Sequence, residues 1–267
     1  MMKNLFLLFL MMCGFTAYAQ ETFYFNASGK KIATRENAKS YIVIDKDSMD
    51  KTHKIVSCFD INSRLMWQDR YSVLRKYKEN SYLLDYLTLS PLRWYALDED
   101  SKRDGQHKEW YSNGQLHVVI DFTDGVKSGE LKSYWMNGSV KRHDVYKNGE
   151  IQKGECLDSL GNKVPYYDYA VKPQISKFDG DVALYLAHNV RYPAQAQELR
   201  IQGRIITRFT ITETGDIANF EILRSVHPIL DAEARRVIEG SGKWVPGMLD
   251  GKEVSVPVIL PVNFRLQ

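Results

Sequence analysis

Side chains that often carry chemistry are present in this chain, but not at catalytic or metal-binding spacing. None of the six histidines forms a His-x-x-x-His pair or lies at ligand spacing from Cys58 or Cys156. The segment Gly240 to Lys243 reads GSGK, but it ends a predicted helix and is followed by Trp244, so it is a helix stop and not a phosphate-binding loop. No Gly-x-Ser-x-Gly motif occurs, and the acids at 98–100 lie in a charged turn. The sequence therefore predicts no enzyme, no metal site and no cofactor.

Backbone groups of the last strand offer another chemistry, which is pairing with a strand from a partner. In VSVPVILPVNFRL, residues 254–266, every second residue is apolar, and this predicts a strand with one buried face. Pro257 and Pro261 both belong to the opposite phase, and proline is tolerated at sheet edges because it has no N–H to donate. The strand is thus predicted to lie at an edge, with its proline side facing outward. Three residues on that side keep their N–H groups: Ser255, Ile259 and Asn263.

Helices and a hairpin are predicted ahead of this strand. Apolar residues at helical spacing predict a helix over 182–190, and a short helix is expected from Pro193, at its N1 position, to a stop at Gly203. Within 208–223, two alternating strands flank the turn at 213–216 and predict a hairpin. His227 is interpreted as the cap of a further helix, whose buried stripe is Leu230, Ala234, Val237 and Ile238.

The middle of the chain repeats. KEWYSNGQL (108–116) returns as KSYWMNGSV (132–140), and a degraded third copy is centred on Gly161. Asp-Gly and Asn-Gly pairs at 124–125 and 148–149 supply a second turn per unit, and such pairs suit tight hairpins. Each unit is predicted to be a two-stranded hairpin, and the array resembles MORN-type repeats. Its aromatic residues are interpreted as core and cross-strand pairs, with an aromatic binding strip as the alternative: Trp110, Tyr111, Tyr134 and Trp135.

The first twenty residues, MMKNLFLLFLMMCGFTAYAQ, are typical of an export signal. Lys3 precedes an apolar run, and Ala17–Ala19 has the small-x-small form of a signal-peptidase site, so the mature chain is expected to start near Gln20. The apolar run is too short to span a bilayer as a permanent helix, and acylation of Cys13 is the alternative. The formal net charge of +3 is near neutral and predicts no nucleic-acid partner. The two remaining cysteines are expected to be free and buried, with a disulfide as the alternative.

Residues 192–266 resemble the C-terminal domain of TonB-family proteins in the order and the spacing of their motifs. The matching pieces are Tyr192-Pro193, Gly203, the turn at Gly215, Leu230-Asp231, Trp244-x-Pro246-Gly247, Gly251-Lys252 and Leu260-Pro261-Val262-Asn263-Phe264. The resemblance implies an α+β fold, in which a three-stranded antiparallel sheet with two packed helices follows the β-rich MORN-like hairpin module. Within it, Trp244 and Pro246 are interpreted as a core anchor and its turn. The expected organisation is a signal peptide at 1–19, a β-rich MORN-like repeat module at 20–164, a linker at 165–180 and a TonB C-terminal-like domain at 181–267.

The resemblance also implies a binding protein of the periplasm. In the family, this domain grips the TonB box of an outer-membrane TonB-dependent receptor, which adds as a strand beside the last strand, and force derived from the proton gradient then opens the receptor. The energy-transducing members carry an uncleaved membrane helix and a long proline-rich spacer, whereas the 8 prolines here are scattered. Receptor binding therefore carries over, and contact with an inner-membrane proton-channel complex is left open. The residues expected to bind the partner are Arg191, Tyr192, Pro193, Ser255, Pro257, Ile259, Pro261 and Asn263.

Other interpretations stay open at this point. The domain can serve strand pairing alone in a non-energised envelope scaffold, and the free edge can pair two copies in an edge-paired homodimer. For Tyr192, the alternative to receptor contact is a ring packed as a lid over a helix start. An enzyme within residues 33–100 has no motif in its support, and periodicity leaves Tyr71 to Leu87 open between a helix and strands.

Overall fold

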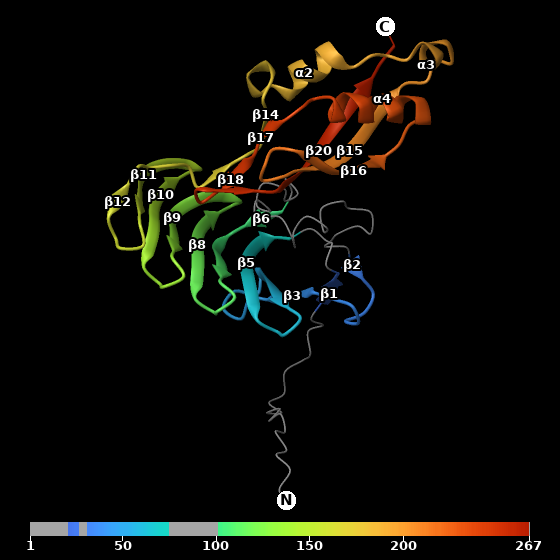
Figure 1. Ribbon diagram of the computed structural model, residues 1–267. Helices are drawn as coiled ribbons and strands as arrows, with labels where there is room; N and C mark the ends of the chain where they lie inside the picture. Colours follow the sequence, from blue (N-terminus) through green and yellow to red (C-terminus); the bar gives the residue numbers. More distant parts are fainter. Residues whose placement is uncertain (1–20, 27–30, 75–100, 267) are drawn as a thin grey trace, which may run out of the picture.

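Residues 21–26, 31–74 and 101–266 are described by the computed structural model (Figure 1). The fold is α+β, with a large antiparallel sheet built from the first part of the chain and a smaller sheet with helices built from the last part. The predicted export signal with Cys13, the acids at 98–100 and most of the segment from Tyr71 to Leu87 lie outside the described residues. Among the described residues, no helix has the length and apolar character needed to cross a membrane.

The large sheet consists of twelve strands that follow one another almost in chain order. They are β1 (Glu21–Phe25), β2 (Lys31–Ile32), β3 (Ser40–Lys46), β4 (Lys54–Asp60), β5 (Leu65–Val73), β6 (Lys102–Arg103), β7 (Gly105–Trp110), β8 (Leu116–Thr123), β9 (Val126–Tyr134), β10 (Val140–Lys147), β11 (Glu150–Leu157) and β12 (Lys163–Val164). The spatial order is β12-β11-β10-β9-β8-β7-β5-β4-β3-β1-β2, and β6 pairs with β5 off this path. Consecutive antiparallel neighbours require only short turns, which is why the repeat sequence can form so wide a sheet.

The turns of the repeats form as predicted. Gly114, Gly138 and Gly161 all have positive φ, between 85° and 89°. The pairs Asp124–Gly125 and Asn148–Gly149 have positive φ at both residues, as the tightest hairpins require. The hairpin array is therefore confirmed, and successive hairpins join edge to edge in one sheet. Kinship with MORN repeats stays a prediction.

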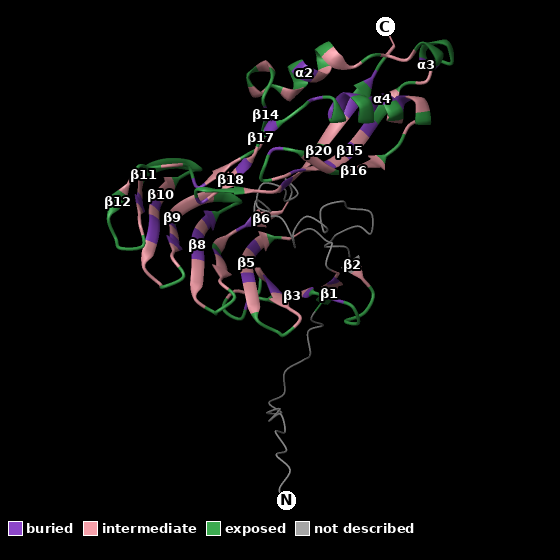
Figure 2. Cartoon of the chain, viewed as in Figure 1, coloured by how far each residue is buried: buried purple, intermediate pink, exposed green. Residues whose placement is uncertain are grey.

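Burial alternates along the strands of this sheet, as the bands in Figure 2 show. Two apolar clusters lie on it. One contains Phe25, Ile42, Val56, Cys58, Trp67 and Tyr71, and the other contains Val118, Ile120, Phe122, Leu131 and Tyr169. The repeat aromatics are half-buried and connect neighbouring turns, because Tyr111 Oη donates to the carbonyl of Tyr134 and Trp135 Nε1 to that of Leu157. These contacts favour the cross-strand interpretation of the aromatic residues.

The segment predicted as a linker, residues 165–180, contains regular structure. It forms β13 (Ala170–Val171), β14 (Gln174–Ile175) and a 3-10 turn, η2 (Phe178–Gly180). β13 pairs with β18 (Gly247–Leu249), and β14 pairs with β17 (Trp244–Val245). The segment is thus held against the last part of the chain, while the domain boundary itself stays a prediction.

The C-terminal part combines helices with an antiparallel sheet whose strand order is β16-β15-β20. Its remaining elements are α2 (Val182–Asn189), α3 (Ala194–Glu198), β15 (Gly203–Ile211), β16 (Ile217–Arg224), α4 (Pro228–Glu239), β19 (Lys252–Val254) and β20 (Val256–Phe264). One core joins α4 to the sheet and includes all four predicted stripe residues of that helix. Trp244 is 6% exposed and belongs to this core, and His227 caps α4 by accepting a hydrogen bond from Ile229 N at 3.3 Å, as predicted.

The short helix α3 differs from its prediction at both ends. Pro193 is its N-cap residue and not its first helical residue. The helix ends at Glu198, Arg200 takes a positive φ of 52°, and Gly203 opens β15. Gly203 was therefore wrongly predicted as a helix stop. Its lack of a side chain serves packing instead, because a Cβ there would meet the Val226 side chain at 2.9 Å.

Candidate functional site

The last strand, β20, pairs with β15 over nine residue pairs without a break in register. One phase of the strand faces the core: Val256, Val258, Leu260, Val262 and Phe264. Val262 and Phe264 are each 1% exposed, and Val258 and Leu260 are partly buried. The buried phase predicted from the apolar alternation is therefore confirmed.

The opposite phase of β20 is turned away from the core. Ile259 is 37% exposed and Asn263 is exposed, while Pro257 and Pro261 are half-buried. Ser255 lies just before the strand, between β19 and β20, and its hydroxyl donates to Glu213 Oε1 over 3.4 Å. Ser255 thus stands at the entrance to the pairing edge and not within the strand.

β20 is an edge strand, as predicted, because within the described ranges no other strand pairs with its second side. One hydrogen bond sets the direction of its backbone groups. The carbonyl of Leu260 accepts from Thr207 Oγ1 at 2.8 Å and so points toward β15. In an antiparallel strand, the N–H and C=O of one residue point to the same side and those of its neighbours point to the other. The polar backbone groups of Ile259, Pro261 and Asn263 therefore point to the free side.

The second edge of this sheet, β16, has a different character. Its pairing with β15 is interrupted by register shifts at two places, and Asn219 within it has a positive φ of 53°. Bulges and local twist disfavour the addition of a further strand, and natural sheets use them to protect edges. The regular edge of β20 is thus the better template for a partner strand.

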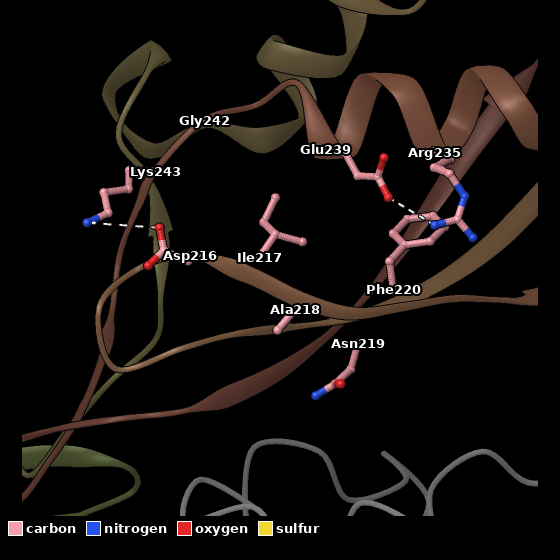
Figure 3. Close-up of a pocket in the computed structure, with 9 residues that line it drawn as sticks. All are labelled: Asp216, Ile217, Ala218, Asn219, Phe220, Arg235, Glu239, Gly242 and Lys243. Carbon is pink, nitrogen blue, oxygen red and sulfur yellow. Dashed lines mark hydrogen bonds and ion pairs between the residues drawn. The ribbon is translucent and has the colours of Figure 1, made fainter.

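A hollow of about 540 Å³ lies beside β16 at the end of α4 (Figure 3). Its charged lining residues are paired with one another. Arg235 Nη1 lies 2.9 Å from Glu239 Oε1, and Lys243 Nζ lies 3.9 Å from Asp216 Oδ1. The guanidinium of Arg235 also lies over the Phe220 ring, 4.3 Å from its centroid. These internal pairs make the hollow a weaker candidate for a charged ligand than its size suggests.

The other predicted site residues, Arg191, Tyr192 and Pro193, lie at the far end of β20. The Tyr192 ring packs edge-on against Phe264, with centroids 5.6 Å apart, and its hydroxyl donates to the carbonyl of Ile201 at 2.7 Å. Arg191 N donates to Glu233 Oε1 at 2.6 Å. The tertiary structure therefore brings this segment to the Asn263 end of the strand, while Ser255 lies at the other end. The Tyr192 contacts also agree with the interpretation of that ring as a lid.

Glu233 anchors this corner to α4. Burial disfavours its charged form, but hydrogen bonds from Arg236 and from Arg191 N hold the pKa of Glu233 below its usual range. Arg236 contributes Nε to Oε2 and Nη2 to Oε1, each over 2.7 Å. The segment before α3 is thus tied to α4 by a backbone hydrogen bond to a carboxylate that is itself paired with Arg236.

A polar network that no sequence pattern predicted is buried in the large sheet. Arg103 Nε and His107 Nδ1 contact Asp69 Oδ1 over 2.8 Å and 2.7 Å, and His107 Nε2 contacts Glu109 Oε1 over 2.9 Å. Burial lowers the pKa of His107, but the charges and hydrogen bonds of Asp69 and Glu109 outweigh it and raise the pKa above 6.5. The alternation of buried and exposed residues along β5 could have indicated that Asp69 is buried, since Asp69 lies in the same phase as two buried aromatic residues of that strand.

Metal and thiol chemistry receive no support from the part of the chain that the structure describes. No group of three His, Cys, Asp or Glu side chains there could hold a metal ion. Neither Cys58 nor Cys156 is in a disulfide and both are buried, as expected.

A comparison with models of protein families agrees with the resemblance seen in the sequence. Residues 188–266 match the family model described as Gram-negative bacterial TonB protein C-terminal. The chain is similar to the NMR solution structure of the Helicobacter pylori TonB C-terminal domain (residues 194–285), with 21% sequence identity and a TM-score of 0.26. That match covers 32% of this chain and 88% of the other. Among curated proteins, none matches the chain.

Proposed function

We propose that this chain is an exported, periplasmic, non-enzymatic protein that binds the TonB box of an outer-membrane TonB-dependent receptor by strand addition. The receptor segment pairs with the free side of β20, and the complex supports energised transport across the outer membrane. The family match over residues 188–266 supports a TonB-like role for the C-terminal part. The single observation that carries the binding mode is the regular second side of β20, with which no strand in the described part of the chain pairs.

The free side of β20 is suited to bind a short extended peptide, with little requirement for a particular peptide sequence. Backbone pairing supplies affinity with any extended segment, while neighbouring side chains select among segments. Along β20 the N–H groups of Ile259 and Asn263 alternate with prolines that accept but do not donate. The position of Tyr192 beside Phe264 and that of Ser255 just before β20 support contacts of Arg191, Tyr192 and Ser255 with the two ends of a paired segment.

Peptide binding to two variants of one residue tests the proposal. A fluorescent synthetic peptide that carries a TonB box is titrated into the purified protein, and the anisotropy gives Kd. In Ile259→Pro the outward N–H is lost and the ring projects toward the incoming strand. The lost hydrogen bond is worth about 0.5–1.5 kcal/mol, so Kd should rise by roughly 2- to 12-fold, at 1.4 kcal/mol per tenfold. Ile259→Val keeps the N–H and should bind as the wild-type protein does.

Equal affinity of the proline variant and the wild-type protein would show that the partner does not pair with this edge. Binding of the peptide at a site insensitive to both substitutions would leave the TonB-like role intact and reject the strand-addition mode. In cells, cross-linking should capture an outer-membrane receptor with the wild-type protein and should not capture it with the Ile259→Pro variant.

A non-energised envelope scaffold is the second candidate function. The twelve-stranded sheet favours it, since this broad surface exceeds what a peptide-binding domain needs. The two functions differ in their dependence on the proton gradient. If the protein supports energised transport, a proton-channel inhibitor should abolish transport through the bound receptor, and contact with an inner-membrane proton-channel complex should be detectable. If it is a non-energised scaffold, the inhibitor should leave partner binding unchanged, and no such contact should be found.

A further inference from the structure

The hairpin of β18 and β19 reaches from the C-terminal part to the large sheet (Figure 1). Its tip is Asp250–Gly251, and both residues have positive φ, 48° and 79°. Such a pair makes a tight two-residue turn. Asp250 is only 4% exposed although it occupies the tip of a hairpin. A buried carboxylate at this position requires partners from another element.

Those partners come from β9 and β10. Ser133 Oγ donates to Asp250 Oδ2 over 2.9 Å, and Lys141 Nζ lies 2.9 Å from the same oxygen. Arg142 Nε donates to Oδ1 over 3.1 Å, and Lys141 Nζ also donates to the Asp250 carbonyl over 2.6 Å. Ser133 and Arg142 are fully buried. The large sheet thus contains a built site that one hairpin tip fills.

The preceding segment closes over the same site. Asp250 N donates to the carbonyl of Tyr169 over 2.6 Å, and Arg142 Nη2 donates to that of Tyr167 over 2.6 Å. The Arg142 guanidinium lies 4.6 Å from the centroid of the Tyr167 ring. A Cβ on Gly251 would lie 2.8 Å from the same ring, so only glycine fits there. The tip of the β18–β19 hairpin, the segment 165–180 and the large sheet therefore meet at this site.

The positive and negative charges at this site are equal in number. Arg142 also pairs with Asp144 over 2.8 Å, so two carboxylates face Arg142 and Lys141. Separating such a buried pair exposes each partner to an environment that cannot solvate it. Partial separation of this contact is therefore costly.

The site lies next to the pairing edge in the chain. β19 follows Gly251 directly, and only Ser255 separates β19 from β20. A pull along β20 therefore reaches Asp250 before it reaches the segment 165–180.

We propose that Asp250 is a positioning residue that locks the C-terminal part to the large sheet, so that force on a strand paired with β20 passes into this sheet. The role in transport rests on the proposed function. While the lock is closed, residues 165–180 are held paired. When it opens, this segment can extend by up to about 50 Å, at roughly 3.3 Å per residue.

Single-molecule pulling across the lock tests this inference without any receptor, so its failure is distinct from failure of the proposed function. Handles are attached to cysteines introduced at two exposed sites, by Met136→Cys beside the site and Ile259→Cys on β20. Asp250→Asn keeps the shape of the side chain and removes its charge. Because removing one partner of a buried charge pair is strongly destabilising, this substitution should raise the rate of opening at a given force by on the order of 100-fold. The opening should lengthen the molecule by up to about 50 Å before the folded parts unfold. Glu253→Gln removes an exposed charge from the same hairpin and should behave as the wild-type protein does.

Equal opening rates in Asp250→Asn and the wild-type protein would overturn the proposal, and so would an equal increase in Glu253→Gln. Where Asp250→Asn also loses the later unfolding steps, Ser133→Ala takes its place. That variant removes one donor of the site, at a cost of at least about one buried hydrogen bond, and should raise the opening rate by about tenfold. No change in Ser133→Ala, with the later steps intact, would likewise overturn the proposal.

Discussion

A proline moved by one residue along β20 should change from harmless to destabilising. The two substitutions are Ile259→Pro and Val258→Pro. The backbone of Ile259 points to the free side of the strand, as do those of the native Pro257 and Pro261. The N–H of Val258 points toward β15, where its partner in the register is Phe209.

The expected magnitudes follow from this geometry. In Val258→Pro, one net hydrogen bond of about 1 kcal/mol is lost, and the carbonyl left without a donor costs about 1–3 kcal/mol more. Because Phe209 is fully buried, water cannot replace the missing donor. The free energy of unfolding should therefore fall by roughly 2–4 kcal/mol. In Ile259→Pro no internal bond is lost, and the change should stay within about 1 kcal/mol.

Native-state hydrogen exchange of the β15 amides, residues 203–211, provides the assay. Val258→Pro should accelerate their exchange by about 30-fold or more, at 1.4 kcal/mol per tenfold, and Ile259→Pro should leave it nearly unchanged. Similar acceleration in both variants would refute the assigned direction of the backbone groups. Faster exchange in Ile259→Pro alone would show that β20 presents its other side to the partner.

Two further predictions concern stability. Gly215→Ala should lower the free energy of unfolding by about 2 kcal/mol or more, because Gly215 has a φ of 81° and a Cβ there would clash with the Trp244 carbonyl oxygen; a melting temperature equal to that of the wild-type protein would contradict this clash. The raised pKa of His107 predicts stability that is complete below pH 6.5 and is lost as the pH rises through the folded-state pKa, because the imidazolium is held by Asp69. Urea unfolding at about pH 6 and about pH 9 should show this loss in the wild-type protein and a smaller one in His107→Gln; equal losses would exclude the buried imidazolium as its source.

Local patterns in the sequence predicted most of the secondary structure. Alternation identified the buried phase of β20, and the stripe over 230–238 identified the face of α4. Asn-Gly and Asp-Gly pairs located the turns of the large sheet. These signals succeed because each depends on residues within a few positions of one another, where side-chain period and backbone φ decide the conformation.

Errors arose where a residue serves a distant contact. The local pattern predicts a helix stop at Gly203, but the glycine is required by the close side chain of Val226. Ser255 was placed within the pairing phase, yet it lies before the strand and contacts Glu213. Neither partner is visible in the local pattern, since each lies more than 20 residues away in the chain.

The sequence by itself determined that this chain forms β-hairpins followed by a helix-and-sheet unit, and that its last strand lies at an edge. The shared phase of the two prolines was sufficient to predict an edge strand, because a residue without an N–H cannot donate to a neighbouring strand in any sheet. Only the tertiary structure decided that Tyr192 reaches the end of that strand and that Asp250 fills a site made by Ser133, Lys141 and Arg142. The physical reason is that a charge becomes informative when burial removes its water, and which charges are buried together depends on chain segments more than 100 residues apart.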